Sequence, residues 1–124
     1  MKNLQKEYGL YINGKWQPAS DGATFKTYSP STGEELAVCA EATREDVDAA
    51  VKAAHAAWES WKNTTPVERA VILNKIADII DANAQHLAEV ESLDNGKPIR
   101  ETSMIDIPMS ADHFRYFAAA IRTE

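Results

Sequence analysis

Cysteine is nearly absent from this 124-residue chain, which contains only Cys39. A single thiol cannot form an internal disulfide, so we expect the protein to work in a reducing cytoplasm. Long apolar runs are also missing, since none approaches the ~20 residues that a membrane-spanning helix needs. The polar residues 1–8 lack the apolar stretch of a secretory signal. The sequence therefore predicts neither a membrane protein nor a disulfide-stabilised secreted domain.

Positive charge and metal ligands are scarce as well. The net charge is −6 and no cluster of Lys or Arg forms a basic face, so we expect no nucleic-acid partner. The three histidines, His55, His86 and His113, lack the spacing of a metal site, and no cysteine or acid pair completes one. No G-x-G-x-x-G loop occurs, so the chain carries no recognisable dinucleotide-binding motif of its own.

Turn signals and β-forming residues dominate the first third of the chain. The pair Asn13-Gly14 between apolar residues is typical of a two-residue hairpin turn. Residues 24–28 alternate and are rich in β-formers, and residues 35–40 read as a partner strand across a turn. We predict a flexible tail over residues 1–8 and two small antiparallel hairpins over residues 9–41.

Helical signals fill residues 43–123. Thr43 and Asp46 form a variant of the capping box, and Thr65 followed by Pro66 is a second helix start. A third segment continues the second helix or restarts at Asn83. Apolar residues recur with helical spacing and predict an apolar stripe on each helix, of which the stripe on the second helix is expected to be buried. The stripes are Val47, Ala50, Val51, Ala54, Trp58 and Trp61; Val67, Val71, Leu73, Ile76, Ile79 and Ile80; Leu87, Val90 and Leu93; and Phe114, Phe117 and Ile121.

An elbow interrupts the helical pattern at residues 91–98. Asn95-Gly96 can supply the positive φ that closes a helix, and Pro98 suits the first turn of a new one. A short helix over residues 99–104 and a last helix over residues 107–122 should follow. No linker or repeat is visible, so we predict one partial domain over residues 1–124, of class α+β.

Six blocks of this sequence resemble the NAD(P)-dependent aldehyde dehydrogenase superfamily, in the family's order. The most distinctive is the elbow Leu-Asp-Asn-Gly-Lys-Pro at residues 93–98. Ser29 departs from the family's Asn-Pro-x-Thr-Gly-Glu turn, where Asn is usual. The last block is similar to a bacterial subgroup that includes acetaldehyde and chloroacetaldehyde dehydrogenases. The blocks lie at residues 10–16, 28–34, 46–61, 68–80, 93–98 and 106–117.

The resemblance implies an α/β parent fold and an enzyme about four times as long. In that family a cysteine thiolate attacks a small aldehyde, hydride passes to NAD or NADP, and a glutamate activates the water that releases the acid. All these groups come from sequence beyond residue 124. We therefore expect an N-terminal part of the cofactor-binding domain, with no catalytic or cofactor-binding residue. This chain alone should be inactive and should bind no nicotinamide cofactor.

Two family roles carry over onto residues of this sequence. Met109 matches a position that lines the substrate tunnel, and packing of the last helix is the alternative. Thr27, Tyr28 and Asp94 match a set that binds a monovalent cation in some members. The alternative for Asp94 is a bond to the backbone of its own turn. Cys39 lies in a predicted strand, far from the family's nucleophile, and is expected to be a small packing residue.

Partners follow from the same resemblance. The parent should bind a small aldehyde and a nicotinamide cofactor and should form a homo-oligomer. This chain should self-associate or pack against the rest of the enzyme. Two rival hypotheses stay open: a non-catalytic remnant that packs on another polypeptide, and a helical interaction module unrelated to redox chemistry. The block-by-block match argues against the second of these.

Overall fold

The computed structural model describes residues 4–123 of the chain. They divide into two compact units, the first ending at Asn63 and the second beginning at Thr64. Each unit is described by itself below, so the expectation of one partial domain stays a prediction. Within the described residues, no helix is long and apolar enough to cross a membrane.

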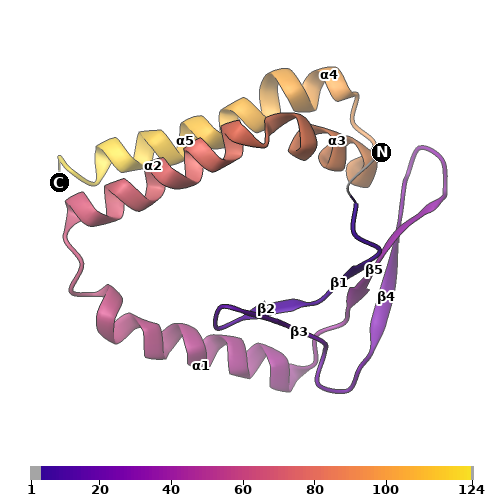
Figure 1. Ribbon diagram of the computed structural model, residues 1–124, viewed down its shortest axis with the longest axis horizontal. Helices are drawn as coiled ribbons and strands as arrows, with labels where there is room; N and C mark the ends of the chain where they lie inside the picture. Colours follow the sequence, from indigo (N-terminus) through magenta and orange to yellow (C-terminus); the bar gives the residue numbers. More distant parts are fainter. Residues whose placement is uncertain (1–3, 124) are drawn as a thin grey trace. The chain divides into compact units, whose positions relative to one another are not determined.

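A three-stranded sheet forms one part of the first unit (Figure 1). Strand β5 (Glu35–Ala40) lies in the middle, antiparallel to β4 (Thr24–Tyr28) and parallel to β1 (Glu7–Tyr8). The antiparallel pair confirms the second predicted hairpin. The flexible tail was predicted too long, because Glu7 and Tyr8 pair with β5; residues 1–3 of that tail lie outside the described residues.

The other predicted hairpin is confirmed as a separate two-stranded sheet. Strands β2 (Leu10–Ile12) and β3 (Lys15–Gln17) pair antiparallel across Asn13 and Gly14. Both turn residues have positive φ, 51° and 76°, which is the requirement of a type I′ turn. The turn chemistry read from the sequence therefore fixes this hairpin's register.

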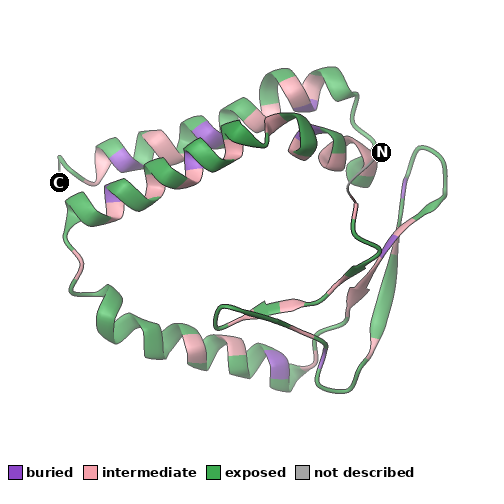
Figure 2. Cartoon of the chain, viewed as in Figure 1, coloured by how far each residue is buried: buried purple, intermediate pink, exposed green. Residues whose placement is uncertain are grey.

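Helix α1 (Arg44–Trp61) completes the first unit and begins as predicted. Thr43 accepts a hydrogen bond from the Asp46 N–H, and Asp46 accepts one from the Thr43 N–H, so the capping box is complete. Asp46 is also the only fully buried residue of the helix. Figure 2 shows α1 exposed over most of its length. The predicted stripe is therefore not covered by the first unit, and its members Val47, Val51 and Trp58 are about half exposed.

Two helices open the second unit. Helix α2 (Pro66–Ala82) carries a complete capping box between Thr65 and Glu68, as the sequence predicts. Helix α3 (Ala84–Asn95) restarts at Asn83, which settles the alternative that the sequence left open. Gly96 then ends α3 in the left-handed region with φ 81°, which confirms the predicted elbow.

The chain after the elbow is helical without interruption from residue 99 to residue 120, but it is not regular. Helix α4 (Ile99–Glu101) leads into a π-helical turn, η1 (Thr102–Asp106), and then into α5 (Ile107–Ala120). The sequence predicted a short helix over residues 99–104 and a last helix reaching residue 122. Helical periodicity alone cannot reveal a widened turn, because the apolar spacing continues through it.

Helices α2 and α5 lie side by side and run antiparallel (Figure 1). Their buried residues are Ala70 and Ala77 on one helix and Ala111 and Ala118 on the other. Arg115 on α5 joins the two helices through ion pairs of 2.9 and 2.7 Å to Asp78 and Asp81. The prediction of a buried stripe on α2 is wrong for three members, since this unit leaves them half exposed: Val67, Val71 and Ile79.

Candidate functional site

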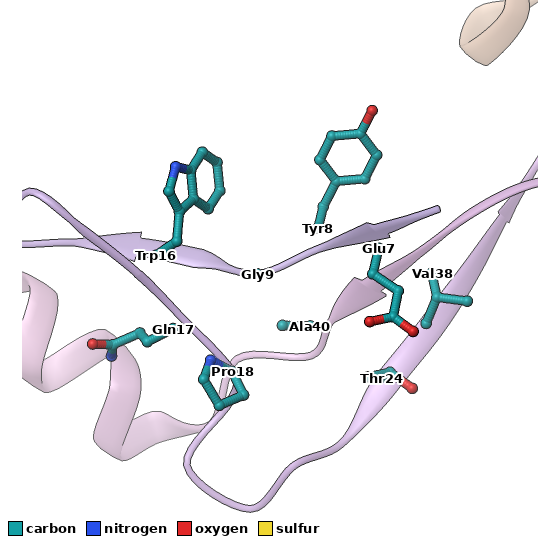
Figure 3. Close-up of a pocket in the computed structure, with 9 residues that line it drawn as sticks. All are labelled: Glu7, Tyr8, Gly9, Trp16, Gln17, Pro18, Thr24, Val38 and Ala40. Carbon is teal, nitrogen blue, oxygen red and sulfur yellow. The ribbon is translucent and has the colours of Figure 1, made fainter. Parts of the chain in front are cut away.

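A cavity of about 470 Å³ lies in the first unit, where the ends of several strands meet (Figure 3). Its volume is in the range of small-molecule sites, roughly 300–1,000 Å³. Gly9, one of its lining residues, lets the chain between β1 and β2 approach Gln17, where a Cβ would lie 2.7 Å from the Gln17 carbonyl oxygen. The lining residues are Glu7, Tyr8, Gly9, Trp16, Gln17, Pro18, Thr24, Val38 and Ala40.

The lining supplies polar atoms but no catalytic set. Figure 3 shows Tyr8 and Trp16 projecting from one side of the ribbon and Glu7 from the other. A carboxylate, an amide at Gln17 and a hydroxyl at Thr24 can hold a polar molecule, but no nucleophile paired with a base lies among them. The cavity was not predicted from the sequence, because Glu7 was assigned to the flexible tail. A two-residue strand paired with a distant segment leaves no local signal.

Asp46 is a buried ionisable group of the first unit that accepts several hydrogen bonds. Its Oδ2 accepts hydrogen bonds from the Thr43 N–H at 2.9 Å and the Ser20 N–H at 3.1 Å. These bonds lower the pKa of the carboxyl, the Thr43 bond most and the Ser20 bond next. Because Asp46 joins the 18–23 loop to the start of α1, its charge serves the structure of this unit.

The residues of the predicted cation set lie in different units. Thr27 is half-buried and Tyr28 is exposed, at an irregularity in the pairing of β4 with β5. Asp94 is exposed near the end of α3. Among residues 4–123, the hydrogen bond to the elbow's backbone comes from Asn95, whose Oδ1 accepts the Lys97 N–H at 2.8 Å. The cation set, and the alternative that Asp94 bonds the backbone of its own turn, both stay predictions.

Met109 lies on α5 with about half of its surface exposed. It follows the π-helical turn by three residues, and its carbonyl oxygen lies 2.8 Å from Nδ1 of His113. The second unit leaves two further apolar side chains of this segment exposed, Met104 and Ile105. The thioether is thus available as part of an apolar wall, and its role in a substrate tunnel stays a prediction.

The remaining candidates lie apart from one another. Cys39 is half-buried in β5, in register with Phe25 on β4 and Tyr8 on β1. The three histidines are exposed on three different helices, α1, α3 and α5. In the part of the chain that the structure describes, no three side chains of His, Cys, Asp or Glu group as metal ligands.

The described residues do not form the backbone turn that usually binds a dinucleotide. Such a site needs a glycine-rich turn between a strand and the start of a helix. The glycines at positive φ instead lie in the β2–β3 turn, in loops or at the elbow, and they are Gly14, Gly22, Gly33 and Gly96. None of these four glycines therefore forms such a turn between a strand and the start of a helix.

Comparison with known proteins gives a consistent result. The sequence model described as "Aldehyde dehydrogenase family" matches residues 16–124. An aldehyde dehydrogenase from Rhodospirillum rubrum is 52% identical over 121 residues, which are 98% of this chain and 24% of that protein. Acetaldehyde dehydrogenase 2 from Cupriavidus necator is 48% identical over 120 residues, again 24% of its length.

Solved structures agree with the sequence matches. The NAD+ complex of an aldehyde dehydrogenase from Bacillus cereus matches with a TM-score of 0.90 and 45% identity. That match covers 94% of this chain and 24% of the solved one. The chain thus spans about a quarter of the length of the relatives it matches.

Proposed function

This chain belongs to the aldehyde dehydrogenase family, and we propose that it is the N-terminal part of an NAD(P)-dependent enzyme that oxidises a small aldehyde to its carboxylic acid. The observation that carries the proposal is the match over residues 16–124, at about half identity to bacterial aldehyde dehydrogenases. We infer that the catalytic cysteine, the glutamate and the cofactor loop lie outside this part of the enzyme. The chemistry accordingly belongs to the rest of the enzyme, and this part supplies structure.

Met109 is the residue of this N-terminal part to which we assign a contact with the substrate. A thioether is flexible and polarisable, so it adapts to an apolar chain without demanding a hydrogen bond. The support is its exposure on α5 and its neighbourhood, since Met104 and Ile105 also present apolar surface. In the complete enzyme we propose that Met109 forms part of the wall along which the aldehyde reaches the nucleophile.

A monovalent cation is the second ligand in this proposal. The Thr27 hydroxyl, the Tyr28 carbonyl and the Asp94 carboxylate are hard oxygen donors, which suit such an ion. The support for Asp94 is that Asn95, and not Asp94, accepts the hydrogen bond from the elbow's backbone at Lys97. The support for Thr27 and Tyr28 is the irregular pairing there, since the register of β4 with β5 shifts between these two residues.

The partners follow from the family. We propose a small aldehyde, a nicotinamide cofactor and the remaining three quarters of the enzyme, working as a homo-oligomer in the cytoplasm. The exposed apolar side chains of α1, α2 and α5 suit packing against further polypeptide. The same observation also suits the alternative, a non-catalytic remnant that packs on a separate chain.

A complementation experiment tests the proposal. The purified chain is incubated with NAD and acetaldehyde, alone and together with acetaldehyde dehydrogenase 2 from Cupriavidus necator from which the matching quarter is deleted. NADH should form only in the mixture. NADH formed by the chain alone, and lost on Cys39→Ala, would contradict the assignment of the chemistry to the rest of the enzyme. Co-purification of the two pieces without NADH would favour the non-catalytic remnant.

A further inference from the structure

The π-helical turn η1 is an exception in an otherwise regular run of helix, and its two ends are held differently. Its first residue, Thr102, is completely buried, and it is the largest side chain of the described residues in that condition. Its last residue, Asp106, forms an ion pair of 2.7 Å with Lys97, in which both partners are partly exposed. The buried end is therefore the one that solvent and salt cannot weaken.

Hydrogen bonds bind Thr102 to α3 and to the preceding turn of its own helix. Its Oγ1 donates to the Ala88 carbonyl oxygen at 3.0 Å and lies 2.9 Å from Oγ of Ser92, both on α3. The same oxygen is 3.2 Å from the Ile99 carbonyl oxygen, one turn back in its own helix. A buried hydroxyl with these partners cannot move without losing them, which would leave buried polar atoms unsatisfied.

The backbone of Thr102 begins the wide turn. The Ile107 N–H donates to the Thr102 carbonyl oxygen, five residues back, where an α-helix would reach only four residues back. Pro108 follows at once and has no N–H to donate, and in a regular α-helix its ring would press on the Met104 carbonyl. The wide turn contains one residue more than an α-helical turn. It lies where Pro108 already interrupts the backbone hydrogen bonds of a regular α-helix.

One additional residue in a turn changes the direction of every later side chain. Each residue of an α-helix turns by about 100°, so closing the wide turn to a regular one would rotate Met109 by about that angle relative to α3. An exposed thioether would then leave the side of the helix on which it now lies. The position of Met109 around the axis thus depends on η1, and η1 depends on its buried end.

We propose that Thr102 is a positioning residue that sets the direction in which Met109 projects, by anchoring the π-helical turn to α3. The functional meaning of this role rests on the proposed function, in which Met109 lines the aldehyde's path. The structural part of the proposal does not need that function. It states that loss of the Thr102 hydroxyl lets η1 relax and moves Met104 and Met109 together.

Methyl-labelled methionine reports these movements in the chain itself. The methyl resonances of Met104 and Met109 are recorded for the natural chain and for Thr102→Val, which keeps the shape of the side chain and removes its hydroxyl. Both resonances should shift in Thr102→Val and return in Thr102→Ser, which restores the hydroxyl. Ala70→Gly is the matched control, because it weakens the buried α2–α5 contact away from η1. It should leave both resonances in place.

Folded Thr102→Val with unshifted resonances would overturn the proposal, and so would an equal shift in Ala70→Gly. If Thr102→Val does not fold, Ser92→Ala decides, since it removes only one partner of the hydroxyl. A smaller shift of both resonances in Ser92→Ala supports the proposal, and none contradicts it. The readout involves neither aldehyde nor cofactor. Failure of the enzyme proposal would therefore leave this result unaffected, and a negative result here would leave the enzyme proposal standing.

Discussion

The α2–α5 pair and helix α1 use their apolar residues in opposite ways. Helices α2 and α5 pack against each other and their buried residues are alanines, while larger apolar side chains of both helices remain exposed. Helix α1 has no such interface: Asp46 is its only buried residue, and its apolar face is open (Figure 2). Within each unit the buried apolar side chains are thus small ones, and the large ones remain for contacts outside that unit.

The contrast has a physical basis. Alanine lets two helix backbones approach closely, and each pair of helices then contributes little apolar area of its own. All apolar residues that are fully buried within the described chain are alanines. Larger side chains contribute most of the free energy of burial, at about 25 cal/mol per Å². A chain that buries alanine and exposes Val, Ile, Phe and Trp gains only part of the stabilisation available to its sequence.

The alanine interface should be the most sensitive part of the molecule. Ala77 is completely buried, so Ala77→Leu must push α2 away from its neighbour and should lower the free energy of unfolding by about 1–3 kcal/mol. Ala82→Leu, at an exposed position of the same helix, is the matched control and should change it by less than about 0.5 kcal/mol. Chemical denaturation measures both. Equal tolerance of leucine at the two positions would mean that the helices do not pack through alanine.

The elbow between α3 and α4 should come next. Gly96 has φ 81°, a region that costs side chains with a Cβ, so Gly96→Val should destabilise the second unit by about 1–3 kcal/mol. Gly96→Asn is the control, because asparagine tolerates the left-handed region better than a β-branched residue does. A denaturation midpoint that is the same for glycine and valine would show that the residue is not left-handed.

Acid should weaken the first unit through Asp46. The hydrogen bonds from Thr43 and Ser20 lower the pKa of its carboxyl in the folded state. Their stabilisation is therefore fully present above the ordinary pKa of 3.8 and is lost as the pH falls through the lower folded value. Asp46→Asn should remove this part of the pH dependence. A pH profile of thermal unfolding that is unaltered by Asp46→Asn would assign the acid sensitivity to other groups.

The features that sequence reasoning predicted correctly are local ones. Two capping boxes, the Asn13–Gly14 turn and the elbow at Gly96 each depend on a few neighbouring residues, whose chemistry specifies one backbone conformation. The family resemblance likewise depends on motifs that can be read directly.

The features that it missed depend on distant partners. Strand β1 was taken as a tail because its pairing with β5 joins segments about thirty residues apart. Helical spacing predicted which face of α2 is apolar but could not tell whether anything covers it, so Val67, Val71 and Ile79 were wrongly expected to be buried. The cavity beside Glu7 and the widened turn at Thr102 have no signature in the order of residues alone. The roles of Met109 and of the cation set come from resemblance and stay predictions.

The large apolar side chains that each unit leaves exposed should serve contacts with further polypeptide. Size-exclusion chromatography with light scattering, combined with a dye that binds exposed apolar surface, measures this directly. We expect self-association or strong dye binding, because a bare patch of a few hundred Å² represents several kcal/mol at about 25 cal/mol per Å². A monodisperse 13.7 kDa monomer with a sharp thermal transition and no dye binding would contradict it.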